Sequence, residues 1–105
     1  MKLIPMKRGD TFALNADITD ANEQPVDYIA SQVRSQVRAK NDELITTLSV
    51  QKVDEIPGRY VLMAGDTSNW PIGTLYMDIE INNGEAIMSS STIEIPVVRD
   101  ITRNE

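Results

Sequence analysis

The sequence predicts an all-β domain, an antiparallel two-sheet sandwich of about seven strands with an immunoglobulin-like arrangement. Two features predict it: short runs of alternating apolar and polar residues, and turn-forming residues that separate those runs. Alternation with a period of two is typical of strands that bury one face. Hairpins with one apolar face need a second layer to cover it, so a sandwich is expected and a small β-barrel is the alternative.

The first clear strand is Thr11–Ile18, where Phe12 and Leu14 begin an apolar face that continues through every second residue. Residues 19–25 are rich in turn formers and end this strand.

The segment Ser31–Ala39 allows two readings. As a strand it places Val33 and Val37 on one face, whereas helical spacing stacks the same two residues with Ile29. We prefer the strand, because residues 40–43 then form a hairpin loop that leads into a β-branched strand at residues 44–50.

Three strands are expected after the Pro57–Gly58 turn. Residues 59–64 are apolar on both faces, which predicts a central strand, and residues 74–81 alternate most clearly. Asn83–Gly84 then predicts a tight hairpin, with positive φ at both residues, into a strand at residues 85–90. The last strand, residues 92–98, contains Pro96, which marks it as an edge or bulged strand.

Tyr60 lies at the start of a strand, directly after Gly58-Arg59. Immunoglobulin-type sandwiches place a tyrosine at such a corner, where its hydroxyl bonds to nearby backbone. The sequence lacks a cysteine at position 62 and a tryptophan in the earlier strands. A plain turn-to-strand tyrosine is therefore the alternative reading.

The composition restricts the classes of function. The 105 residues predict one domain, residues 1–105, and the absence of cysteine and histidine removes disulfides, thiolate zinc sites and the commonest general base. A net charge of −6 argues against binding to nucleic acid or to anionic membranes. The first eight residues contain too short an apolar segment for a signal peptide, so synthesis in the cytoplasm without export is expected.

The motifs predict no catalytic, cofactor-binding or metal-ligating residue, and no cofactor. Arg8-Gly9-Asp10 reads as a tight turn before a strand, and Asp17, Asp20 and Asn22 lack the spacing of a calcium loop. Asp78 and Glu80 read as an exposed strand face, and the serines at 89–91 have no accompanying base.

The candidate interface residues are Arg34, Arg38, Trp70 and Tyr76. Arg34 and Arg38 would form a basic stripe with Lys40, either as a solvated face or as a contact for an acidic partner subunit. Trp70, the single tryptophan, is either a core residue or an interface residue.

Several motifs resemble a family of small phage and prophage tail-region proteins, which are similar to the modules of baseplate and tail-fibre proteins. The resemblance lies in residues 7–12, Pro25-Val26-Asp27, Val37-Arg38, Gly58-Arg59-Tyr60, Trp70-Pro71-x-Gly73, residues 76–79 and residues 97–102. It implies an immunoglobulin-like or related sandwich that acts in tail, neck or fibre assembly. Its implied location is the virion, and its implied partners are other virion proteins or a second copy, with no nucleic acid, membrane or small-molecule substrate.

Strand addition at exposed edges, including the segments around Pro5 and Pro96, is the expected mode of contact. A carbohydrate- or surface-ligand-binding module is the alternative function. It needs exposed aromatic residues, and aromatic residues are 5% of this chain. A small hydrolase is the remaining alternative, and it would need a pocket that raises the pKa of a carboxyl group.

Overall fold

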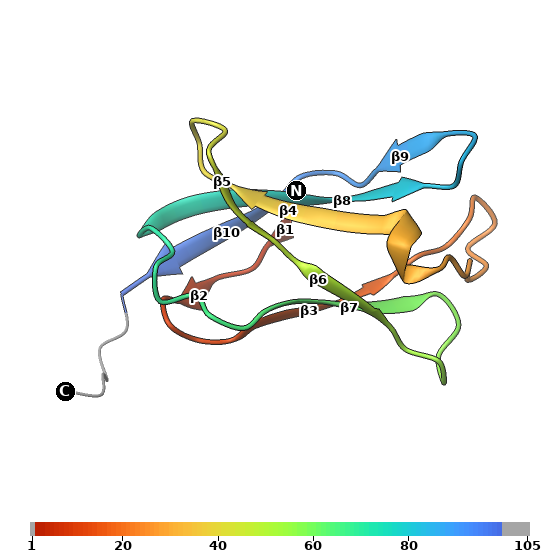
Figure 1. The fold of residues 1–105 in the computed structure, drawn as a ribbon, viewed down its shortest axis with the longest axis horizontal. Coiled ribbons are helices and arrows are strands. Elements are labelled where there is room, and N and C mark those ends of the chain that lie inside the picture. Colours follow the sequence, from red (N-terminus) through yellow and green to blue (C-terminus); the bar gives the residue numbers. More distant parts are fainter. Residues whose placement is uncertain (1, 100–105) are drawn as a thin grey trace.

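The computed structural model describes residues 2–99 and consists of two β-sheets that face each other (Figure 1). Its ten strands are β1 (Lys2–Leu3), β2 (Met6–Lys7), β3 (Phe12–Asp17), β4 (Val33–Arg38), β5 (Leu44–Thr47), β6 (Ser49–Lys52), β7 (Arg59–Ala64), β8 (Gly73–Asn82), β9 (Ile87–Ser89) and β10 (Ile93–Val98). The helical structure in residues 2–99 is a single 3-10 turn, η1 (Ala30–Gln32). The all-β prediction is confirmed.

The larger sheet has the strand order β1-β10-β8-β4-β5, with β2 also paired to β10 and β9 also paired to β8. The smaller sheet has the order β3-β7-β6. No strand belongs to both ladders within the described residues, so the two-sheet sandwich, and not the small barrel, is the architecture. β7 pairs on both sides, which confirms that residues 59–64 form a central strand.

The core lies between the sheets and follows the period-two pattern of the strands. Leu75 and Met77 of β8 are each 2% exposed, and the intervening Tyr76 is half-buried on the opposite face. Leu62 of β7 and Ile95 of β10 are fully buried and come from opposite layers. The same alternation that predicted the strands therefore builds the core.

The segment of residues 44–50 is two strands instead of the one that the sequence predicts. β5 pairs with β4 in the larger sheet, and β6 pairs with β7 in the smaller one. Leu48, which is 3% exposed, separates them and belongs to the core cluster. The chain changes sheets here because a buried side chain is needed between the layers where one strand ends and the next begins.

Residues 31–39 are strand β4, preceded by the turn η1. Ser35 lies on its buried face between Val33 and Val37, and the Ser35 hydroxyl donates to the carbonyl of Asp78 at 2.6 Å. This bond satisfies a polar group that burial would otherwise make costly. The strand reading is the correct one of the two.

The prediction from Pro96 is wrong, because β10 is neither an edge strand nor bulged. It pairs with β8 in an unbroken register over residues 93–97 and with β1 and β2 on its other side. Residues 2–7 keep one offset against β10, which places Pro5 opposite Pro96. The amide of Ile4 donates to the carbonyl of Glu94 at 2.8 Å. The next bond of a parallel ladder would need an N–H at residue 96, and proline has none.

The hairpin at Asn83–Gly84 exists, but its turn is longer than predicted. β8 ends at Asn82 and β9 begins at Ile87. Gly84 has a φ of +92°, whereas Asn83 is not among the described residues with positive φ. Instead the Asn83 side-chain oxygen accepts bonds from the amides of Glu85 and Ala86, each at 2.9 Å. An asparagine that bonds forward in this way favours a wider turn over the two-residue one.

Tyr60 joins the start of β7 to the long connection between β3 and β4. Its side chain is fully buried, its hydroxyl donates to the carbonyl of Tyr28 at 2.7 Å, and the same hydroxyl accepts the amide of Tyr28. The bonded backbone is therefore 32 residues upstream and not local, as a tyrosine corner would require.

Gly58 and Asp27 hold the same connection. The amide of Gly58 donates to the Asp27 carboxylate at 2.8 Å. Gly58 has a φ of +76°, and a Cβ at this position would lie 2.7 Å from the carbonyl oxygen of Ile18. Glycine is required here by both the backbone conformation and the close approach.

Candidate functional site

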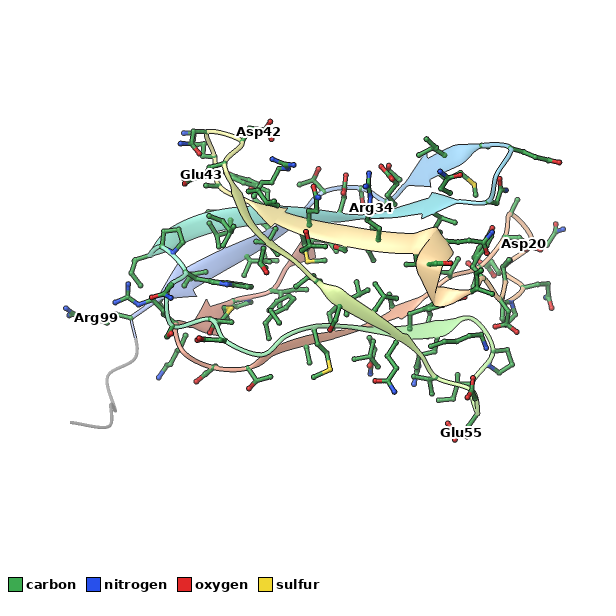
Figure 2. The ribbon with its side chains drawn as sticks, viewed as in Figure 1. Asp20, Arg34, Asp42, Glu43, Glu55 and Arg99 are labelled. Carbon is green, nitrogen blue, oxygen red and sulfur yellow. The ribbon has the colours of Figure 1, made fainter. Side chains whose placement is uncertain are left out.

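The outer face of the larger sheet carries three of the four candidate interface residues. Arg34 and Arg38 of β4 lie opposite Glu80 and Tyr76 of β8 in the ladder. Figure 2 shows Arg34 on the side of β4 that faces away from the smaller sheet. Arg34, Arg38 and Tyr76 are therefore brought together on one surface.

The basic stripe expected on this face is electrically compensated. Arg34 forms an ion pair with Glu80 at 3.0 Å. The Arg38 guanidinium donates to the carbonyl of Asp42 at 2.8 Å and to the side-chain oxygen of Gln36 at 2.9 Å. The face is a polar surface of mixed charge, so a positive patch for an acidic partner is not what the strand pairing produces.

A shallow hollow of about 570 Å³ lies on this face beside the β4–β5 hairpin. Arg38, Tyr76, Asp78 and Thr92 are among the residues that line it. The hairpin tip, which carries Asp42 and Glu43, projects beyond the sheet at one end of the molecule (Figure 2). The hollow offers hydrogen-bonding groups of both charges and one aromatic ring.

Trp70 lies in the core instead of on the surface. It is 3% exposed, and its ring packs against Phe12 with centroids 5.6 Å apart and planes at 45°. Phe12 and Tyr60 are also buried, so the aromatic side chains left with partial exposure are Tyr28 and Tyr76. This distribution gives the carbohydrate-binding alternative no stacking platform.

The carboxylates singled out in the sequence are engaged in local structure. Asp17 accepts two bonds from Arg59, at 2.8 and 3.0 Å, and the bond from Arg59 holds the pKa of Asp17 below its usual value. The Asp20 carboxylate accepts the amides of Asn22 and Gln24 and closes its own turn. Within residues 2–99 no group of three or more acidic side chains is placed to hold a metal ion.

Asp27 is held in the same way at the start of β7. The amide of Gly58 lowers the pKa of the Asp27 carboxyl group, burial opposes that effect, and Lys52 at 3.5 Å lowers the pKa further. This carboxylate therefore serves to fasten the connection between β3 and β4.

Two further motifs also have structural explanations. In the Arg8-Gly9-Asp10 turn, the amide of Gly9 donates to the buried hydroxyl of Thr67 at 2.9 Å, and that hydroxyl donates to the carbonyl of Asp10 at 2.6 Å. The Ser90 hydroxyl accepts the amide of Ile79 at 2.9 Å. Asp78, expected beside Glu80 on an exposed face, lies opposite Gln36.

Sequence reasoning missed an apolar surface beside β9. Ile87 and Met88 of this strand are 65% and 42% exposed. Met88 lies opposite Ile81 and faces a groove toward β3, whereas Ile87 lies opposite Asn82 on the other face. The only signal in the sequence was a short apolar pair in a strand that the pattern did not place at the end of a sheet.

No protein-family model matches this chain, and no curated protein matches it either. Among the residues that the structure describes, no helix is long and apolar enough to cross a membrane. Of the motifs that resemble tail-region proteins, residues 100–102 lie outside the described residues. What fold and surface define is a two-sheet β-sandwich whose outward features are a polar sheet face and an exposed apolar strand.

Proposed function

We propose that this chain is a structural protein of a phage or prophage particle, an immunoglobulin-like sandwich that joins a tail, neck or fibre assembly through protein contacts. The observation that carries the proposal is the exposure of Ile87 and Met88 on one short strand, at 65% and 42%. Large apolar side chains gathered on a surface are typical of protein-binding sites. The resemblance of the sequence motifs to tail-region proteins supplies the setting.

The strand order supports the immunoglobulin-like part of the proposal. If β3, β6 and β7 correspond to strands B, D and E, the order β3-β7-β6 matches B-E-D of that fold. The order β10-β8-β4 likewise matches G-F-C, with β5 added beside C as in variable-type domains. The chain departs from that fold in lacking the cysteine pair and in having its N-terminal strands beside β10.

A role through contacts alone is also favoured by what the polar side chains do. Asp17, Asp20 and Asp27 are bonded within turns and strand ends. Arg34 and Arg38 are bonded across or beside their own strand. Groups used in this way stabilise the fold and present no activated nucleophile or base.

The test is the composition of purified particles. Particles from an induced or infected host are isolated on a density gradient, and their proteins are measured by mass spectrometry. We expect this chain in the particle fraction at a fixed ratio to the tail proteins, and we expect deletion of its gene to stop assembly. Intact, infective particles that lack the chain would refute the proposal.

A further inference from the structure

The smaller sheet has an open strand position beside β3. This sheet has three strands, whereas the larger sheet has a path of five, and β3 pairs with β7 alone among the described residues. The opposite edge differs, because β6 follows directly on β5, which belongs to the larger sheet. The side of the sandwich at β5 and β6 is therefore closed by the chain itself, and the side at β3 is open.

The backbone of β3 presents hydrogen-bonding groups to this open position. The amide of Ile18 donates to the carbonyl of Gly58 at 2.8 Å, so the even-numbered residues of this segment bond toward β7. In an antiparallel ladder the alternate residues direct both groups to the other side. Ala13, Asn15 and Asp17 thus direct N–H and C=O groups away from β7.

An apolar groove runs beside the same edge. It has a volume of about 430 Å³ and lies between β3 and the inner face of β8 and β9. Its apolar lining includes Leu14, Ile18, Ile79, Ile81, Met88 and Ile93. A strand added beside β3 would point every second side chain into this groove.

The walls of the groove select a basic partner. Residues 11–33 and 60–98, which supply both walls, contain no lysine or arginine and nine aspartates and glutamates. Arg59, which lies opposite Asp17, already donates two bonds to that carboxylate. Acidic walls without free cations complement lysine or arginine on a bound segment.

The other edges carry features that discourage strand addition. The β1–β2 edge includes Pro5 and Lys7, and β6 ends in Lys52. Proline removes a ladder donor and lysine on an edge resists further pairing. β3 has neither residue type.

We propose that an extended segment of a partner protein, apolar at alternate positions with lysine or arginine between them, adds to the smaller sheet beside β3. The segment would bond to the backbone of Ala13, Asn15 and Asp17 and bury its apolar side chains against Ile81 and Met88. This inference names the partner chemistry for the contact role proposed above and rests on that role only in requiring a protein partner.

The experiment measures binding of the peptide acetyl-Lys-Val-Lys-Ile-Lys-Val-Lys-amide to the full chain by calorimetry. Met88→Lys places a charge in the groove, and Ile87→Lys places the same charge on the other face of the same strand. We expect Met88→Lys to weaken binding by about tenfold or more, and Ile87→Lys to weaken it by less than about threefold. Circular dichroism and thermal unfolding establish that both variants are folded.

Two further arms separate strand addition from simple charge attraction. A peptide with glutamate in place of lysine should bind at least about tenfold more weakly. Asn15→Pro, which removes an amide that points away from β7, should weaken binding as much as Met88→Lys. Equal binding to the two lysine variants, equal binding of the two peptides, or no binding at about 1 mM peptide would overturn the inference. Presence of the chain in particles together with any of these results would leave the proposed function intact and reject this site alone.

Discussion

The hydroxyl of Tyr60 allows a sharp test of how the fold is held together. Tyr60→Phe keeps the buried ring and removes one oxygen that donates to the carbonyl of Tyr28 and accepts its amide. A neutral hydrogen bond contributes about 1 kcal/mol net, and a partner group left unsatisfied costs about 1–3 kcal/mol. Because the Tyr28 backbone is only partly buried, water can satisfy some of it, and we expect a loss of about 2 kcal/mol.

The assay is equilibrium unfolding in urea, followed by circular dichroism at neutral pH. The midpoint should fall while the slope against denaturant stays the same, since the exposed area on unfolding is unchanged. Tyr76→Phe, on the outer face of the larger sheet, is the matched control and should change stability by less than about 0.5 kcal/mol. An equal effect of both substitutions, or a Tyr60→Phe effect below about 0.5 kcal/mol, would refute the role assigned to this hydroxyl.

Three more outcomes follow from single contacts. Gly58→Ala should destabilise by about 1–3 kcal/mol in the same urea assay, because a Cβ would lie 2.7 Å from the Ile18 carbonyl at a φ of +76°, whereas Gly84→Ala, with open space around it, should cost less. Trp70→Ala should cost about 3–5 kcal/mol by leaving a cavity beside Phe12, and a loss below about 1 kcal/mol would contradict its place in the core. Asp17 has a lowered pKa in the folded state, so its pairing with Arg59 stabilises above the unfolded pKa of about 3.9 and is lost as pH falls through the lower folded value. Asp17→Asn should therefore reduce the loss of stability between pH 5 and pH 2, read from urea midpoints across that range, and an unchanged acid slope would exclude this contribution.

The strands of this protein could be predicted because most of them bury one face. Residues 59–64 were placed with their observed bounds, and residues 74–81 lie inside β8. In both, the side chains alternate between the core and the other face or are apolar throughout, and that pattern is visible in a single sequence.

Features that depend on contacts distant in sequence could not be predicted. β1 and β2 exist because residues 2–7 pair in parallel with β10, and nothing local in such short strands signals a partner more than ninety positions away. Pro96 was misread for the same reason. Its missing donor faces Pro5 across that ladder, so the proline interrupts the neighbouring strand without placing its own strand at an edge.

The candidate surface was predicted only in part. Strand alternation correctly placed Arg34, Arg38 and Tyr76 on one face, but it could not show that Glu80 and Gln36 neutralise or bind the two arginines. The groove at β3 arises from the unequal widths of the two sheets. That inequality is a property of the whole topology and has no signature in any one segment.

Amide hydrogen exchange along β3, measured residue by residue by NMR on the free protein, tests the open edge most directly. The amides of Leu14 and Ala16 should be strongly protected by the ladder to β7, and those of Ala13, Asn15 and Asp17 should exchange orders of magnitude faster. Equal, strong protection of both sets would show that the outer side of β3 is already paired, and would contradict the central claim that this edge is free to receive a partner strand.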